Sequence, residues 1–178
     1  MAATLQQVDA RVRKGDAHDA SRLAPFAQQL FRKADDAFLA TFDADALFAM
    51  AKQGMAFLEG LAEDDDAMRV EVVNPAFAAD GWACDCTVVR LALHDRPFVV
   101  DSVRAEVRGQ GFEVDHVLHP VFAIARDEAR RIVEVADRLH LALGPDEGTG
   151  APSPHANVDE IARLRQELDA LLERLGRH

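Results

Sequence analysis

The spacing of apolar residues changes once along this chain of 178 residues, and that change constrains the fold more than any other feature. Up to residue 62, apolar side chains recur three or four positions apart, as on one face of a helix. After residue 67 they alternate with polar ones, as in strands with one buried face. A helical segment followed by a strand-rich part predicts an α+β fold.

Two helices stand out in the first 62 residues. From Pro25 to Lys33, two phenylalanines and a leucine recur at helical spacing. A second helix is expected to begin near Asp43 or Asp45, either of which suits the cap position, and to run toward Leu61. We expect its methionines and phenylalanines to pack as core against a sheet rather than to bind a cofactor.

The alternating part predicts four strands and one helix. The strands are expected at Met68–Val73, Thr87–His94, Phe112–Ala125 (kinked at Pro120) and Arg131–Val135, the last two forming a hairpin. Pro97 is expected at the first position of the helix, where a missing N–H is tolerated. The helix should bury a valine stripe and end at a glycine; these residues are Val100, Val103, Val107 and Gly109 or Gly111.

Residues 144–157 are rich in glycine, proline and small polar side chains, which indicates a flexible connector. Residues 158–178 then form an amphipathic helix whose apolar stripe must be covered by its own sheet or by another chain. The predicted organisation is therefore a helical segment (1–62), an α+β domain (63–143), the connector and the C-terminal helix.

Three motifs have the residue types of metal sites, but their spacing argues against metal. The acidic run Glu63–Asp66 lacks the alternating spacing and turning glycine of a calcium loop, so a solvated loop is expected. Cys84 and Cys86 lack a second pair and are expected to be buried, reduced thiols on one strand face, poorly placed to bridge each other. His116 and His119 should point to opposite faces of a strand.

Charge and hydropathy exclude several partners. The net charge of −11 opposes binding to a phosphate backbone, so no nucleic-acid partner is expected. No apolar run reaches the roughly 20 residues that span a bilayer, and the N-terminus has no secretory h-region. We therefore expect a cytoplasmic protein without a membrane partner.

A known family shares several of these features in the same order. The segment HDRPFVVDSVRAEVRGQGFEVDHVLHPVFAIARD, with the upstream VEVVNPAFAADGW, resembles the N-terminal ACT-like (ACT1) domain of the large bacterial NAD-specific glutamate dehydrogenases. The matching positions are Asn74, Pro75, Gly81, Trp82, Asp95, Pro97, Phe98, Val99, Val100, Asp101, Ser102, Val103, His119, Pro120, Phe122, Arg126 and Asp127. The resemblance covers about residues 22 to 137, and it implies a ferredoxin-like βαββαβ sheet packed by helices. The family's next segment, which contains Arg-Glu-Ser, is replaced here by residues 137–143.

The resemblance implies a regulatory or assembly domain without catalytic residues. In the family, separate C-terminal domains bind NAD and convert L-glutamate to 2-oxoglutarate. No Gly-x-Gly-x-x-Gly opens a helix here, and Gly109-x-Gly111 closes one. The family's catalytic lysine has no counterpart, since all three lysines lie in the helical segment. We expect no cofactor and no metal in this chain.

The candidate ligand site is the turn that enters the predicted helix. N–H groups at a helix N-terminus bind carboxylates, and the resemblance implies that amino-acid effectors bind at this turn. The candidate residues are Asp95, Arg96, Pro97, Phe98, Asp101 and Ser102. Arg96 is suited to a bidentate pair with a carboxylate, whereas Asp95 is equally suited to capping the helix.

Three functions remain open from the sequence. The first is a domain that contacts other domains or copies of a dehydrogenase, with an amino acid as a candidate effector. The second is a stand-alone amino-acid-binding ACT protein, which a chain complete from Met1 to His178 would allow. The third is a homo-oligomerisation module that pairs through the helix at 158–178.

Overall fold

The computed structural model describes residues 2–14, 17–61, 67–95 and 97–137, together with 166, 168 and 170. These residues form two compact units: a first unit from Met1–Gly60, Asn74–Cys86 and His116–Gly144, and a second from Leu61–Val73, Thr87–Asp115 and Pro145–His178. The sequence predicted consecutive segments instead, and those boundaries stay a prediction. The expectations for Glu63–Asp66, Arg96, residues 138–157 and most of 158–178 lie outside the described residues.

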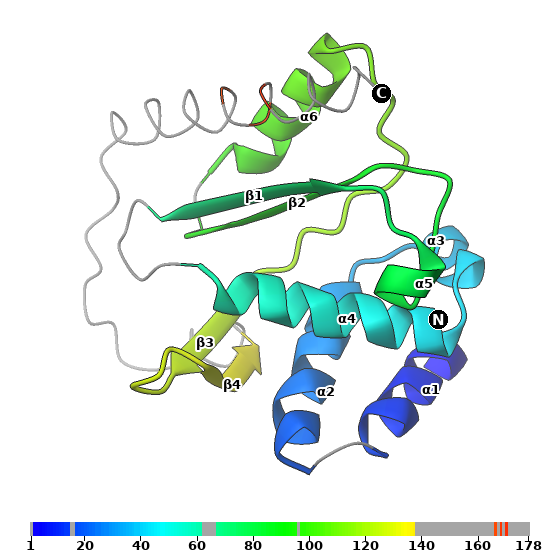
Figure 1. Ribbon diagram of the computed structural model, residues 1–178, viewed down its shortest axis with the longest axis vertical. Coiled ribbons are helices and arrows are strands. Elements are labelled where there is room, and N and C mark those ends of the chain that lie inside the picture. The colour runs from blue at the N-terminus through cyan, green and yellow to red at the C-terminus, as the bar shows by residue number, and fades with distance from the viewer. Residues whose placement is uncertain are drawn as a thin grey trace. The chain divides into compact units, whose positions relative to one another are not determined.

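The first unit contains five helices and a strand pair among its described residues (Figure 1). Its elements are α1 (Ala2–Val12), α2 (Ala17–Phe31), α3 (Asp36–Thr41), α4 (Ala44–Glu59), the short α5 (Phe77–Asp80), β3 (Phe122–Arg126) and β4 (Ile132–Asp137). Helices α1, α2 and α4 pack against one another, and α2 also packs against β4.

Helix α4 confirms the predicted cap and the predicted burial of its apolar face, although it packs against α1 and α2 rather than mainly against a sheet. Asp43 is its N-cap and accepts a hydrogen bond of 2.8 Å from the backbone N–H of Ala46. This bond satisfies one of the four N–H groups that a helix start leaves without an intrahelical partner. The buried face is formed by Leu47, Met50, Ala51, Met55 and Phe57.

Helix α2 begins eight residues before the predicted start at Pro25. Pro25 lies inside the helix rather than at its first position. Proline favours the first turn because it lacks an N–H, but packing can hold it further along a helix. Leu23 and Phe26 on either side of Pro25 are both buried, so core packing outweighs the cost of proline here.

The predicted hairpin of the last two strands is confirmed. Strands β3 and β4 pair antiparallel, with Phe122 opposite Asp137. The ring of Phe122 stacks on that of Phe26 in α2, with centroids 4.5 Å apart, and Gln29 donates to the carbonyl of Val121 at 2.8 Å. The predicted third strand is too long, because residues 112–121 have no strand pairing.

Two arginines fix the hairpin to the helices. Arg22, whose side chain is 10% exposed, donates to Glu59 at 3.2 Å and to the carbonyl of Ile132 at 2.7 Å. The N–H of Ile132 donates to the same carboxylate oxygen of Glu59 at 3.2 Å. Arg126 donates to the carbonyls of Leu58 and Glu59 at 2.8 and 3.1 Å, so it caps the C-terminus of α4.

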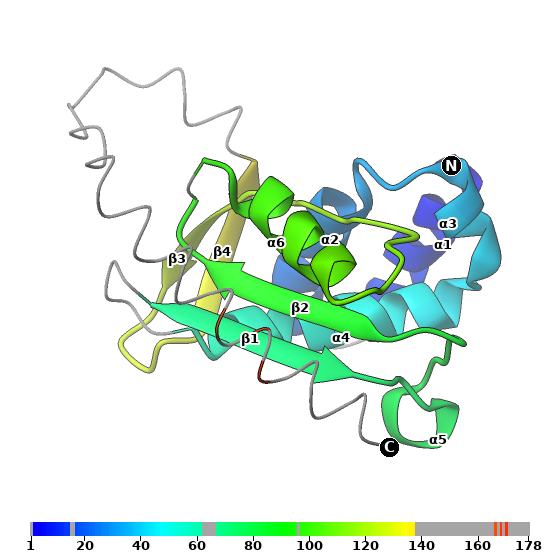
Figure 2. The same cartoon turned by 90° about the horizontal axis from the view of Figure 1, so that it is seen from above.

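The second unit contains strands β1 (Met68–Val73) and β2 (Val88–Leu93) and helix α6 (Val99–Gly109). Both strands were predicted from their alternation; the structure adds that they pair antiparallel, and α6 covers one face of the pair (Figure 2). The core of this unit comprises Val107 and Leu168, with Val70, Val72, Val89, Val103 and Val114 packed against them. Val103 and Val107 of the predicted stripe therefore pack with the strands, and Leu168 belongs to the same cluster.

The predicted N-terminus of α6 is wrong, whereas its predicted C-terminus is confirmed. The N-cap is Phe98, so Pro97 lies just outside the helix and is not its first residue, and Asp95 does not occupy the cap position. At the other end Gly111 has a φ of +86°, and its N–H donates to the carbonyl of Arg108 at 3.0 Å. A left-handed residue there ends the helix, as the glycines predicted.

The α+β class is confirmed, with a difference in the sheets. The described strands form two separate two-stranded sheets, β1–β2 and β3–β4, rather than one sheet of four. In the part of the chain that the structure describes, we find no helix that is long and apolar enough to cross a membrane.

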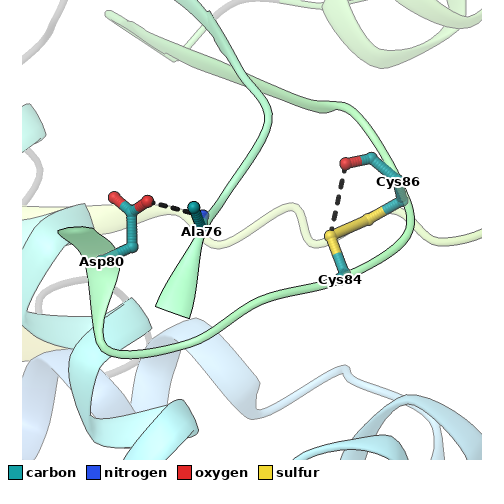
Figure 3. Close-up of a disulfide and its surroundings, with 4 residues drawn as sticks. All are labelled: Ala76, Asp80, Cys84 and Cys86. Atoms are coloured by element: carbon teal, nitrogen blue, oxygen red, sulfur yellow. Dashed lines mark hydrogen bonds between the residues drawn. A yellow bond between two sulfur atoms is a disulfide. The ribbon is translucent and has the colours of Figure 1, made fainter. Parts of the chain in front are cut away.

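The expectation of reduced, buried cysteines is wrong. Cys84 and Cys86 are joined by a disulfide, with their Cα atoms 5.2 Å apart (Figure 3). They lie in the loop between α5 and β2, not on a strand, and Cys86 is exposed. The bend at Asp85 and Cys86 places the two side chains close enough to bond, which an extended strand would not.

Replacing Arg22 tests the arginine contacts. Arg22→Ala leaves the carboxylate of Glu59 and the carbonyl of Ile132 without this donor, so we expect a loss of about 3 kcal/mol in the free energy of unfolding. Urea unfolding followed by circular dichroism measures it. Arg13→Ala, which breaks the exposed pair with Asp9, is the control and should cost a small fraction of that loss. Equal losses would contradict a central role for Arg22.

The turn between β3 and β4 provides a pH prediction. Hydrogen bonds from the backbone N–H and then the guanidinium of Arg131 hold the pKa of Asp127 below its ordinary value of 3.8. Because the folded pKa is depressed, this stabilisation is present above the unfolded pKa and is lost as pH falls through the folded pKa.

An NMR titration of the Asp127 carboxyl in the native chain and in Arg131→Ala measures this effect. Since the backbone hydrogen bond is the largest single cause and does not need the guanidinium, the pKa of Asp127 should stay below its ordinary value in the variant. A return to the ordinary pKa would show that the guanidinium dominates.

Candidate functional site

The turn that enters α6 brings five of the six predicted site residues onto one short segment. Asp95, Pro97 and Phe98 are exposed there, whereas Arg96 lies outside the described residues. Asp101 is exposed in the first turn of the helix, and Ser102 is buried. The described part of the site is therefore an open surface with a buried hydroxyl-bearing residue one turn in.

Phe98 has a backbone that aromatic residues rarely adopt. Its φ is +66° and its ψ is +3°, the left-handed region, which costs a residue with a Cβ on the order of 1–2 kcal/mol. The residue is 67% exposed, so burial of the ring does not compensate for that cost within this chain. Strained residues of this kind concentrate at ligand and partner contacts.

The start of α6 has polar groups suited to an anion. Phe98 gives the helix no side-chain cap, and the first backbone bond of the helix runs from the N–H of Ser102 to the carbonyl of Phe98 at 3.0 Å. N–H groups at a helix start carry partial positive charge and attract carboxylates. Asp101 in the same turn makes that attraction weaker, because its own carboxylate competes for it.

Other motif residues hold the first unit together. Trp82 is 4% exposed; its ring meets Phe42 edge-on at 5.9 Å, and its Nε1 donates to the side-chain oxygen of Gln53 at 3.1 Å. Gln53 in turn donates to the carbonyl of Asp80 at 2.8 Å. Gly81 has a φ of +74° and ends α5, which turns the chain so that Trp82 can enter the core.

The histidines and a small hollow do not form a site. Among the described residues no group of three or more metal-binding side chains occurs. His116 lies edge-on to the ring of Phe38 at 5.4 Å and 3.6 Å from a carboxylate oxygen of Asp35.

The hollow between α2 and β4 has a volume of about 160 Å³, below the roughly 300 Å³ at which ligand pockets begin. The sequence carries no signal for this hollow, because its two walls come from segments over 100 positions apart. The lining residues are Pro25, Gln28, Gln29 and Arg32 on one side and Val135 and Ala136 on the other.

The family model for the glutamate dehydrogenase ACT1 domain matches residues 26–174. The chain belongs to this family. The ACT1 match spans both compact units, and so includes both the structural motif residues and the turn that enters α6.

Two curated relatives agree with this assignment. The NAD-specific glutamate dehydrogenase of Halomonas elongata is 34% identical over 112 residues, which is 63% of this chain and 6% of the relative. That of Pseudomonas aeruginosa is 32% identical over 72 residues, 40% of this chain and 4% of the relative. The matched region thus spans a small fraction of the relatives' length. No solved structure matches the chain.

Phe98→Gly tests whether the left-handed backbone of Phe98 lowers the stability of this ACT1 domain. Glycine adopts the left-handed backbone freely, but it loses more conformational freedom on folding, so we expect a net stabilisation of about 0.5–1 kcal/mol. Thermal unfolding of the two chains measures it. Phe112→Gly is a control, because it removes another exposed phenylalanine whose φ is not positive; it should not stabilise. A destabilised Phe98→Gly chain would mean that the ring contributes to this domain's own fold.

Proposed function

We propose that this chain is a non-catalytic regulatory and assembly domain of an NAD-specific glutamate dehydrogenase. Its family and its relatives support the parent enzyme, because both relatives carry that name. In this proposal NAD and glutamate bind to other domains of the parent, and this chain itself takes neither cofactor nor metal. Its partners are other domains or copies of the parent, in the cytoplasm, without nucleic acid or membrane.

The observation that carries the proposal is the entrance to α6. An exposed aromatic ring on a left-handed backbone and a helix start without a side-chain cap coincide at Phe98. Neither feature stabilises the chain by itself, and both suit contact with another molecule. The ligand we propose is a free amino acid, whose carboxylate would bind at the helix start with Arg96, Asp95, Pro97, Phe98, Asp101 and Ser102 as the candidate residues.

The ferredoxin-like sheet belongs to the same proposal. Strands β1 and β2 with α6 would belong to the ACT-like part. Leu168 is fully buried in the valine cluster of the second unit, and residues 166, 168 and 170 are helical. This burial favours a C-terminal helix that covers its own sheet over one that pairs two chains.

A thermal-shift screen of the purified chain against the amino acids tests the effector. A ligand at a hundredfold excess over its Kd adds about 2.7 kcal/mol, and each kcal/mol raises the Tm by roughly 2–4 °C in a chain of this size. We expect a saturable shift with one or a few amino acids that Arg96→Ala abolishes. Arg104→Ala is the matched control, since it removes an exposed arginine of α6 and should keep the shift.

The other outcomes separate the competing functions. A shift with NAD or NADH would overturn the assignment of a non-catalytic domain. No thermal shift with any amino acid would overturn effector binding and leave assembly as the proposed role. Pull-down of a dehydrogenase core by this chain would then test that role. A shift in a chain shown to be complete at His178 would favour a stand-alone amino-acid-binding protein.

A further inference from the structure

We propose that Cys84 and Cys86 form a thiol–disulfide exchange site that low-molecular-weight thiols open and disulfide oxidants close. The bond encloses a single residue, Asp85, and no other cysteine exists in the chain to compete for either sulfur. This inference does not depend on the effector site proposed above.

The residues around the disulfide are exposed enough for a small thiol to approach it. Cys86 is exposed and Cys84 is half-buried, and the residues on either side, Ala83 and Thr87, are exposed. Figure 3 shows the pair on the loop that follows Asp80. Exchange requires a thiolate to approach one sulfur directly, so accessible disulfides are the labile ones, whereas structural disulfides resist reduction.

The loop that contains the disulfide is anchored at both ends, so the state of the bond affects the conformation of the segment between the two anchors. Before it, Trp82 is held in the first unit by Gln53 and Phe42. After it, β2 begins at Val88, opposite Val73 of β1 in the second unit. The chain passes from the first unit to the second between Cys86 and Thr87. The disulfide therefore limits the conformations of the short segment that joins the two units at this point.

The exchange itself balances with thiols alone. A thiolate attacks one sulfur, the S–S bond breaks, and a mixed disulfide and one protein thiol form. A second thiol then releases the reagent as its own disulfide, so that two protein thiols are produced while two reagent thiols are oxidised. Because only one residue separates the sulfurs, the mixed disulfide should reclose readily in the native chain.

The proposed cytoplasmic location supports reversible opening and closing of this disulfide. Disulfides that form in reducing compartments are mostly transient or redox-sensing. This step alone rests on the cytoplasmic location proposed above. In that setting an exposed pair at a junction is better suited to exchange than to permanent cross-linking.

The test is native-state reduction of the purified full chain with reduced glutathione or dithiothreitol, followed by N-ethylmaleimide labelling and mass spectrometry. We expect two labels per chain after reduction and none before it, at a rate within about tenfold of that of the urea-unfolded chain. Oxidised glutathione should then remove both labelling sites. Cys86→Ser should accumulate the mixed disulfide at Cys84, and the double variant Cys84→Ser/Cys86→Ser should not respond.

Two structural readouts separate exchange from unfolding. Hydrogen exchange of the peptide containing residues 83–88 should speed up on reduction, while the fluorescence of Trp82, the only tryptophan, should stay as in the oxidised chain. A bond that opens only after unfolding would overturn the proposal, since it would then be a structural cross-link. So would thiols that oxidise only into dimers of two chains, or hydrogen exchange that does not change on reduction.

Discussion

The carboxylate of Glu59 at the end of α4 is the contact on which the first unit depends. It accepts from Arg22 in α2 and from the backbone of Ile132 in β4, which lies 110 residues beyond Arg22. Arg126 then caps the same helix end from β3. A helix terminus has carbonyls that need donors, and a hairpin edge has N–H groups that need acceptors. One acid and two arginines meet both needs, and the stacked rings of Phe26 and Phe122 join α2 to β3 as well.

Two kinds of residue make up the motifs that this chain shares with its family. Gly81, Trp82 and Arg126 have structural roles, since each ends a helix, fills the core or caps α4. Phe98 differs, because it costs backbone strain and is mostly exposed. Residues of the first kind explain why a chain with this sequence pattern folds. The second kind is where contact with another molecule is best sought, and the motif alone does not separate the two.

Local features were predictable from the sequence, and long-range polar contacts were not. Alternation placed β1 and β2, and the side chain of Asp43 marked the start of α4, because both depend on neighbouring residues. The same reasoning extended the third strand back to Phe112, although strand pairing needs a partner and β4 reaches only Phe122. The pairing of Arg22 with Glu59 and the left-handed Phe98 leave no local signal. The cysteines were misread because they were assigned to a strand, whereas a bend brings their side chains together.

The interleaving of the two units along the chain has a consequence for synthesis on the ribosome. Helices α1, α2 and α4 emerge first, but β3 and β4, which contribute Phe122 and Ile132 to their unit, emerge only after the whole of α6. During that interval the apolar side of α2 lacks its hairpin. A nascent chain stalled before residue 122 would therefore expose the ring of Phe26 and the guanidinium of Arg22, both of which are buried in the finished domain.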